Sequence, residues 1–246
     1  MNDNIDYNTQ NIHPRDKKIT FFGDQHKYVI EGKEIISVST IISQFFSVFD
    51  REYWAMRKAS QMQMTPEQVI DMWDEKGKQA IAKGDFMHKQ IENFYLGKPV
   101  EESTDTFIFR QFTDKHKHLI PYRTEWPIFD DKYPIAGTID LLAKNGEAFE
   151  IYDWKRSTNV VNIYGQPIKE SPYSKKANGV ISHLDDCSYI KYALQQSMYK
   201  YILETNYGLN IANMFLVVIH PKYDRYYKIS LPYLKKEVVD ILETLV

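Results

Sequence analysis

Two apolar runs joined by a short polar turn most constrain what this chain can fold into. Residues 135–143 and 148–155 are rich in strand-forming side chains, and Asn145-Gly146 lies between them. Asn and Gly tolerate the positive φ angles of the tightest β-turns, so this pair between two such runs is a strong hairpin signal. The sequence therefore predicts two neighbouring antiparallel strands within a sheet.

The second of these strands ends in charged residues. Because side chains alternate across a strand, Asp153 and Lys155 share the face of Ile151, whereas Glu150 lies on the opposite face and is excluded from direct cation binding. The hairpin brings Asp140, at the end of the preceding apolar run, near the same region. Two carboxylates within reach of one position suit a hard divalent cation such as Mg²⁺, which takes one or two carboxylates, waters and substrate phosphate.

Lys155 adds a function that an apolar residue could not supply. Beside a cation and a phosphate, an ammonium group orients or helps to deprotonate an attacking water and stabilises the charge that develops on the phosphorus oxygens. The alternative is an exposed ion pair between Asp153 and Lys155, which contributes about 0–1 kcal/mol and has no function. For an isolated Asp-x-Lys that alternative is preferred, so the rest of the chain must decide.

Composition narrows the class of protein and of cation site. With 246 residues, of which 43% are hydrophobic and 26% charged, the chain is expected to form one globular domain with a sizeable core. A single cysteine, Cys187, rules out an internal disulfide, and also a zinc site or iron–sulfur cluster built from several cysteines of this chain. Any metal is therefore held by oxygen and imidazole ligands.

Charge and hydropathy bear on partners and location. The formal net charge of −2 provides no general basic field, so an anionic substrate needs a local basic patch or a bound cation. No apolar stretch is long enough for a membrane span, and the polar start lacks the plan of a signal peptide. We expect a soluble cytoplasmic protein without a membrane partner.

Local patterns assign the other elements. We expect residues 1–18 to be flexible, residues 19–83 to form a β-meander and helices, residues 84–230 to form the core, and residues 232–246 to form a final helix. Within the second segment, one helix is expected over about 39–60 with an aromatic core face. A second, capped by Thr65, runs to about Tyr95 and could be two helices meeting at Lys83-Gly84.

The core segment alternates between strands and helices. Besides the hairpin, strands are expected at about 122–129, 213–220 and 225–230, helices at about 104–119 and 186–206, and a long loop at 157–185. No strand is followed by a Gly-rich phosphate loop, which argues against a nucleotide-binding domain. The order favours an α/β fold with a central mixed β-sheet flanked by helices.

Two helices carry further candidate site residues. His88 lies on a helix in the motif G-D-F-M-H, and Glu92 follows one turn later on the same face. Gln195 and Tyr199, four residues apart on the helix after the long loop, stand side by side and could hydrogen-bond a phosphate or a base. Each of these alone is most simply an ordinary helix residue.

Together and in this order, the motifs are more specific. G-x-x-x-H, an acid, G-x-x-D, D-x-K and Q-x-x-x-Y follow one another over about residues 84–201. This series resembles the RecB-like branch of the PD-(D/E)XK nuclease superfamily. The flanking sequences are similar in pattern to phage and bacterial members of that branch, which are related to the mitochondrial genome maintenance exonuclease.

The resemblance implies a single nuclease domain with a restriction-endonuclease-like core, in which each site residue has a role. The implied metal ligands are His88, Asp140, Asp153 and the backbone carbonyl of Trp154. The implied catalytic residues are Lys155, Asp140 and Asp153; supporting roles fall to Glu92 and Glu125, and substrate contacts to Gln195, Tyr199 and Arg156. Mg²⁺ is the expected cofactor, and the imidazole ligand makes Mn²⁺ a good substitute. An iron–sulfur cluster, which some members bind, is not expected.

The implied activity is that of a Mg²⁺-dependent deoxyribonuclease. We expect an exonuclease that acts on DNA ends or single strands during replication, recombination or phage DNA processing in a bacterial or phage-infected cytoplasm, with protein partners from those processes. Tyr164 and Tyr173 in the long loop could stack on unpaired bases. Two alternatives stay open, a non-catalytic DNA-binding or scaffold protein with the same fold and a hydrolase of a smaller phosphate ester. Cutting polarity and oligomeric state also stay open.

Overall fold

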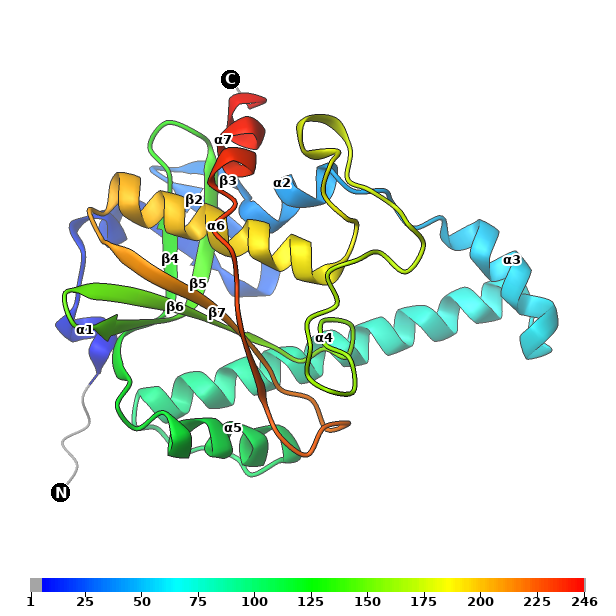
Figure 1. Ribbon diagram of the computed structural model, residues 1–246, viewed down its shortest axis with the longest axis horizontal. Coiled ribbons are helices and arrows are strands. Elements are labelled where there is room, and N and C mark those ends of the chain that lie inside the picture. The colour runs from blue at the N-terminus through cyan, green and yellow to red at the C-terminus, as the bar shows by residue number, and fades with distance from the viewer. Residues whose placement is uncertain (1–5, 246) are drawn as a thin grey trace.

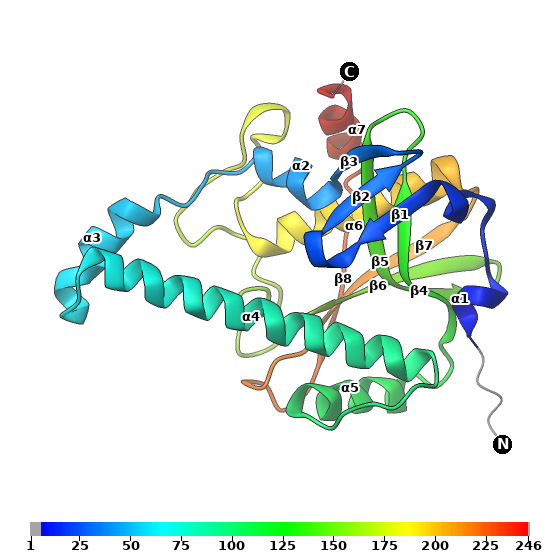
Figure 2. The ribbon, with the colours of Figure 1, turned by 180° about the vertical axis from the view of Figure 1, so that it is seen from behind.

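The computed structural model describes residues 6–245 and shows helices on both faces of a central mixed sheet (Figures 1 and 2), as expected. The strands are β1 (Ile19–Phe22), β2 (Lys27–Ile30), β3 (Lys33–Ser37), β4 (Ile120–Phe129), β5 (Ile135–Asn145), β6 (Ala148–Lys155), β7 (Ile211–Val218) and β8 (Tyr227–Ser230). The α-helices are α1 (Tyr7–Gln10), α2 (Val38–Gln44), α3 (Arg51–Met62), α4 (Pro66–Tyr95), α5 (Thr104–Lys115), α6 (Ser188–Asn206) and α7 (Lys235–Glu243). Within the described residues, no helix has both the length and the apolar character needed to span a membrane.

The sheet places the charged end of β6 between two neighbouring strands. The strand order is β1-β2-β3-β5-β6-β7-β8, and β4 also pairs with β5. The β5–β6 hairpin closes at Asn145 opposite Ala148, and Gly146 takes a φ of +60°, as the Asn-Gly pair predicts. β6 then pairs in parallel with β7, after a crossover through the long loop and α6. Lys155, the last residue of β6, is paired with Val218 of β7.

Two apolar clusters fix the helices on opposite faces of the sheet. On one face, Ile151 of β6 packs with residues of α2, α6 and α7, among them Met198. On the other face, Trp154 packs with Met87 of α4 and Phe112 of α5. Burial of a large apolar side chain contributes about 1.5–3 kcal/mol, so both clusters hold β6 firmly between the helix layers.

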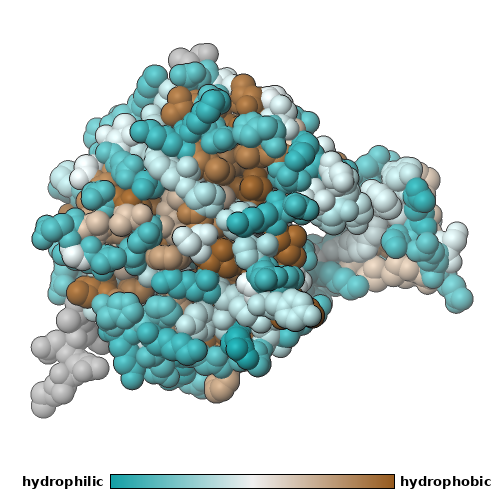
Figure 3. Space-filling model, in the orientation of Figure 1, coloured by the Kyte–Doolittle hydropathy of each residue, from teal (hydrophilic) through white to brown (hydrophobic). Residues whose placement is uncertain are grey.

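An arm formed by α3 and the first half of α4 projects from the body (Figures 1 and 3). The expected single helix over residues 39–60 is wrong. α2 ends at Gln44, and α3 begins after Asp50, whose side chain accepts a 2.9 Å hydrogen bond from the backbone N–H of Tyr53. Phe49, in the segment before α3, and Tyr53, on α3, are both expected in the core but are 54% and 44% exposed. A local helix cap thus overrides a continuous apolar pattern.

α4, in contrast, is one helix of 30 residues that passes through Lys83-Gly84 without a break. Thr65 caps it as expected, because its side chain accepts a hydrogen bond from the backbone N–H of Gln68 and the Gln68 side chain accepts one from the backbone N–H of Thr65. A glycine inside a helix costs about 1 kcal/mol relative to alanine, which the buried residues Met87 and Ile91 of the next turns can offset.

Residues 6–18, part of the segment expected to be flexible, pack against β4. Residues 1–5 lie outside the described residues, but Asn8 exchanges two hydrogen bonds with the backbone of Thr124, at 3.0 and 2.9 Å. Asn11 donates to the carbonyl of Tyr122, and Asp16 forms a 2.7 Å ion pair with the buried Arg123. Asparagine side chains satisfy backbone groups at the free edge of β4, which is why a polar segment can pack there.

Candidate functional site

Three side chains from three elements converge where α4 packs on the sheet. His88 of α4, Glu125 of β4 and Asp140 of β5 each place one ligand atom within 4.8 Å of the others. His88 Nδ1 lies 3.6 Å from Glu125 Oε1 and 3.5 Å from Asp140 Oδ2. We refer to these residues as the His–Glu–Asp cluster. One imidazole nitrogen and two carboxylate oxygens form a donor set that suits Mg²⁺ or Mn²⁺.

The peptide group of Trp154 orients two members of the cluster. Its N–H donates a 2.8 Å hydrogen bond to Asp140 Oδ2, and its carbonyl oxygen lies 2.9 Å from His88 Nε2. Because a carbonyl oxygen only accepts, Nε2 is the protonated nitrogen, and Nδ1 is turned toward the carboxylates. Metal-binding histidines commonly donate their second N–H to such an oxygen. The Trp154 carbonyl, expected as a metal ligand, is here the group that orients the imidazole.

Glu125 has an unusual backbone conformation. Its φ is +45°, and it falls between the β4–β5 pairs formed by Thr124 and Trp126, at the position opposite Asp140. A non-glycine residue in this region costs on the order of 1–3 kcal/mol, and such strain is concentrated at functional sites. The sequence assigns Glu125 only a supporting role, whereas the structure makes it one of the three converging side chains.

Asp153 lies beside the cluster and has its own partners. Its side chain is 2% exposed; Oδ1 accepts a 2.8 Å hydrogen bond from Gln196 Nε2, and Oδ2 lies 2.8 Å from Lys155 Nζ. One step further along the β5–β6 register, Asp153 is opposite Asp140. It is not one of the residues whose ligand atoms converge. In this structure Asp153 therefore anchors Lys155, although the sequence assigns it to the metal.

Gln196 is a site residue that the sequence motif does not single out. The motif selects Gln195, but the amide that contacts Asp153 belongs to the next residue, which is 1% exposed. Among the described residues, the buried Gln196 Oε1 has no hydrogen-bond donor, and the buried Asp153 Oδ2 has only its ion pair with Lys155. Buried acceptors of this kind are normally satisfied by an ordered water or a cation. This environment fits a cation site and could not be read from residue order alone.

Burial and mutual charge set the protonation of the site. Burial opposes the charged form of His88, but the Asp140 and Glu125 carboxylates more than offset it and raise the pKa of His88 to about 9. Burial raises the pKa of Asp153 to about 6 against the opposing charge of Lys155, and burial also raises the pKa of Asp140. Burial disfavours the Lys155 ammonium as well, yet Asp153 and Asp140 hold its pKa above the usual value.

Gly137 and Tyr199 form a packing pair. A Cβ atom on Gly137 would lie 2.4 Å from Tyr199 Cε1, so the aromatic ring packs directly on the backbone of β5. Tyr199 is 3% exposed, and its hydroxyl accepts a 2.9 Å hydrogen bond from Gln195 Nε2. The glycine of G-x-x-D and the tyrosine of Q-x-x-x-Y thus depend on each other. Tyr199, expected to contact substrate, is buried and positions Gln195.

The structure does not bring every expected residue to the cluster. The Glu92 carboxylate pairs with Lys89 at 2.7 Å, on its own helix. Arg156 Nε donates to Asp105 Oδ2 at 2.8 Å, so its guanidinium is turned toward α5. Glu92 thus has no contact with the cluster among the described hydrogen bonds and ion pairs.

Comparisons with known proteins add little to this geometry. No family model and no curated protein matches the chain. A crystal structure of SSO0001 superposes with a TM-score of 0.36 and 16% sequence identity, over 85% of this chain and 74% of that one. A likeness at this level supports no inference about fold or function.

Proposed function

We propose that this protein is a metal-dependent DNA nuclease with a restriction-endonuclease-like core, of the RecB-like PD-(D/E)XK type that its motifs resemble. The observation that carries the proposal is the convergence of His88, Glu125 and Asp140 beside the buried pair of Asp153 and Lys155. The side chains of that pair are 2% and 18% exposed, so the alternative of a solvated surface ion pair does not describe them. Burying this many charges costs desolvation free energy, and buried charged groups with perturbed pKa values are concentrated at functional sites.

The cation would be held by His88 Nδ1 and the carboxylates of Glu125 and Asp140, with Asp153 beside them. A bound Mg²⁺ or Mn²⁺ supplies Lewis acidity toward a phosphate and lowers the pKa of a water ligand. The protein's part is to hold the ligands in place. Trp154 fixes the imidazole through its carbonyl and Asp140 through its N–H, so two ligands are positioned by one rigid peptide group.

Lys155 supplies a fixed positive charge for the phosphate that is cut. Asp153 holds the ammonium at 2.8 Å, and the Tyr192 ring centroid lies 5.0 Å from Nζ on another side. The Asp153 and Asp140 carboxylates favour the ammonium form of Lys155, which suits it to stabilise the charge that develops on the phosphate oxygens. Its two neighbours keep it in place without reorganisation during the reaction.

DNA is the proposed substrate, cut from its ends or as single strands. Tyr164 and Tyr173 of the long loop are 78% and 74% exposed and are available to stack on unpaired bases. Exposed aromatic residues in a loop suit a polymer with bases better than a small phosphate ester.

Hydrolysis of labelled DNA tests the proposal. Linear single-stranded, linear duplex and circular DNA are incubated with Mg²⁺, Mn²⁺ or a chelator. We expect cation-dependent loss of linear DNA, lowered by at least about 10²-fold in Asp140→Asn and Lys155→Met. Asp131→Asn, which alters a 60% exposed carboxylate paired with Arg15, is the matched control and should cut normally.

Each other outcome selects a different conclusion. If both Asp140→Asn and Lys155→Met still digest DNA, the proposed site is not the catalytic site. DNA binding without cutting, under all these conditions, establishes the non-catalytic alternative. Hydrolysis of small phosphate esters without cutting of any DNA establishes the third alternative.

A further inference from the structure

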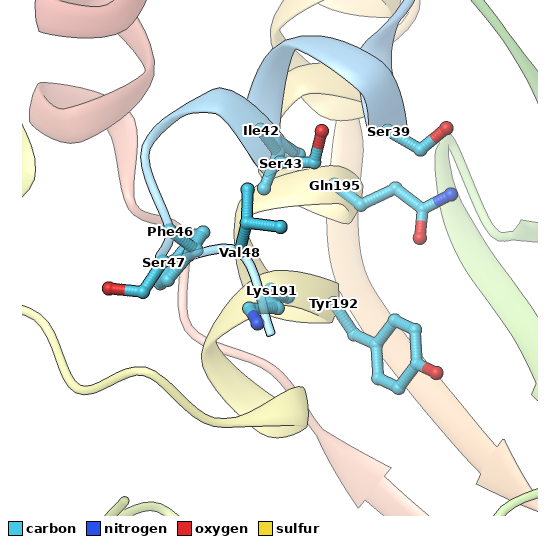
Figure 4. Close-up of a pocket in the computed structure, with 9 residues that line it drawn as sticks. All are labelled: Ser39, Ile42, Ser43, Phe46, Ser47, Val48, Lys191, Tyr192 and Gln195. Carbon is cyan, nitrogen blue, oxygen red and sulfur yellow. The ribbon is translucent and has the colours of Figure 1, made fainter. Parts of the chain in front are cut away.

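A cavity of about 360 Å³ lies between α6 and the segment formed by α2 and the residues that follow it (Figure 4). Its lining residues are Ser39, Ile42, Ser43, Phe46, Ser47, Val48, Lys191, Tyr192 and Gln195. The volume falls within the range of small-molecule sites in proteins. Val48 is 91% exposed and stands at the mouth of the cavity, whereas Ile42 and Phe46 are buried and form its floor.

The cavity adjoins the proposed catalytic lysine. Tyr192 and Gln195 are three residues apart on α6, so they share one face of the helix, and both line the cavity. The Tyr192 ring lies 5.0 Å from Lys155 Nζ. Gln195 is held by its hydrogen bond to the buried Tyr199. A group in the cavity would therefore be one side chain away from the phosphate that Lys155 is proposed to contact.

The chemistry of the cavity suits an uncharged planar group better than a phosphate. Among the nine lining residues, all in the described part of the chain, Lys191 carries the charge. Its ammonium pairs with Asp186 at 2.7 Å and lies 4.6 Å from the centre of the Phe46 ring, so its charge is largely neutralised. Apolar walls, an aromatic ring and the amide of Gln195 offer a stacking surface and a hydrogen-bonding edge, which every nucleobase can use.

We propose that this cavity binds one unpaired nucleobase of the strand whose phosphate lies at Lys155. A base in a duplex has its faces stacked and its edge paired, so it must be unpaired before it can enter, which costs a few kcal/mol. The cavity thus selects single strands and frayed ends over closed duplex. This inference rests on the proposed function and adds the form of DNA that the site accepts.

Fluorescence titration without hydrolysis tests the cavity. A single-stranded ten-nucleotide DNA with 2-aminopurine at either end is titrated with protein in chelator. Val48→Trp and, independently, Ser43→Trp fill the cavity from two walls. Because a base-stacking contact changes affinity by about 5- to 150-fold, we expect each variant to weaken binding within that range. Ile12→Trp, at a 64% exposed position that does not line the cavity, is the matched control and should bind as the wild type does.

The outcomes separate this inference from the proposed function. Equal binding by Val48→Trp, Ser43→Trp and Ile12→Trp overturns the cavity assignment, even if the wild-type protein cuts DNA with a cation. A closed hairpin duplex that competes as well as the single strand also overturns it. Cavity-dependent binding of single strands by a protein that cuts no DNA leaves the cavity assignment in place and overturns the nuclease.

Discussion

The packing of Tyr199 on Gly137 predicts that adding a single methyl group at residue 137 destabilises the fold. In Gly137→Ala, the new Cβ would lie 2.4 Å from Tyr199 Cε1 and 2.9 Å from both Cζ and the hydroxyl oxygen. Favourable contacts between carbon atoms begin near 3.5 Å, so the ring must withdraw by about 1 Å. Tyr199 is buried and bonded to Gln195, so this movement disturbs the core and the amide together. Overpacking of this kind costs about 1–3 kcal/mol in the free energy of unfolding.

Gly84→Ala provides a control with the opposite sign. A Cβ atom at Gly84 would have no heavy atom within 4 Å other than those of its immediate surroundings in α4. Because alanine is the better helix former, this variant should be more stable than the wild type by about 1 kcal/mol. Urea unfolding, followed by circular dichroism, measures both variants. The two substitutions add the same methyl group, one where it meets no other segment and one against Tyr199, so a loss of stability in Gly137→Ala alone points to the close contact.

A double-mutant cycle identifies the clash itself. Tyr199→Ala alone should cost about 3–5 kcal/mol, because it leaves a cavity where a large aromatic ring was buried. Once the ring is absent, Gly137→Ala has no atom to displace, so its own cost should vanish in the Tyr199→Ala background. If the two costs add instead, the contact between the ring and the glycine is not the reason for the glycine, and the reasoning fails.

Three further predictions concern single residues. Burial raises the pKa of Asp16, but hydrogen bonds, chiefly from Arg123, more than offset burial and hold this pKa below its usual range. The Asp16 carboxylate therefore contributes stability above about pH 4, and this contribution is lost as the pH falls through the lower pKa of the folded state. Asp16→Asn should therefore lower the free energy of unfolding by about 1–3 kcal/mol at pH 7, with a smaller difference in acid; a difference constant with pH contradicts this. Gln196→Leu leaves the buried Asp153 Oδ1 without its donor and should lower the free energy of unfolding by about 1–3 kcal/mol in urea unfolding, whereas unchanged stability argues against a positioning role. Glu125→Asn should lose Mn²⁺ affinity. In urea unfolding it should nevertheless be more stable than Glu125→Ala by about 1 kcal/mol, because asparagine tolerates positive φ. Equal stability of the two variants would show that the φ of Glu125 carries no strain.

Local patterns predict much of the fold. The Asn-Gly turn predicts the β5–β6 hairpin, and strand alternation predicts that Asp153 and Lys155 lie on the face opposite Glu150. Thr65 marks the start of α4. These features depend on residues close together in the chain, so the sequence carries them directly. The break between α2 and α3 and the docking of residues 6–18 are different, because a few polar side chains outweigh a broader pattern: Asp50 at the break, and Asn8, Asn11 and Asp16 in the docked segment.

The site shows the same difference between what nearby residues determine and what tertiary packing determines. Sequence order alone brings His88, Asp140, Asp153 and Lys155 forward as candidates, because their chemical types and spacing are visible in it. Tertiary packing decides what each one contacts. The positive φ of Glu125 within β4 accompanies its approach to His88 and Asp140, and a buried amide from α6 contacts Asp153 beside Lys155. Side-chain periodicity gives the face on which a residue lies, but the partner on that face comes from a distant segment, and only the packed core sets which atoms meet.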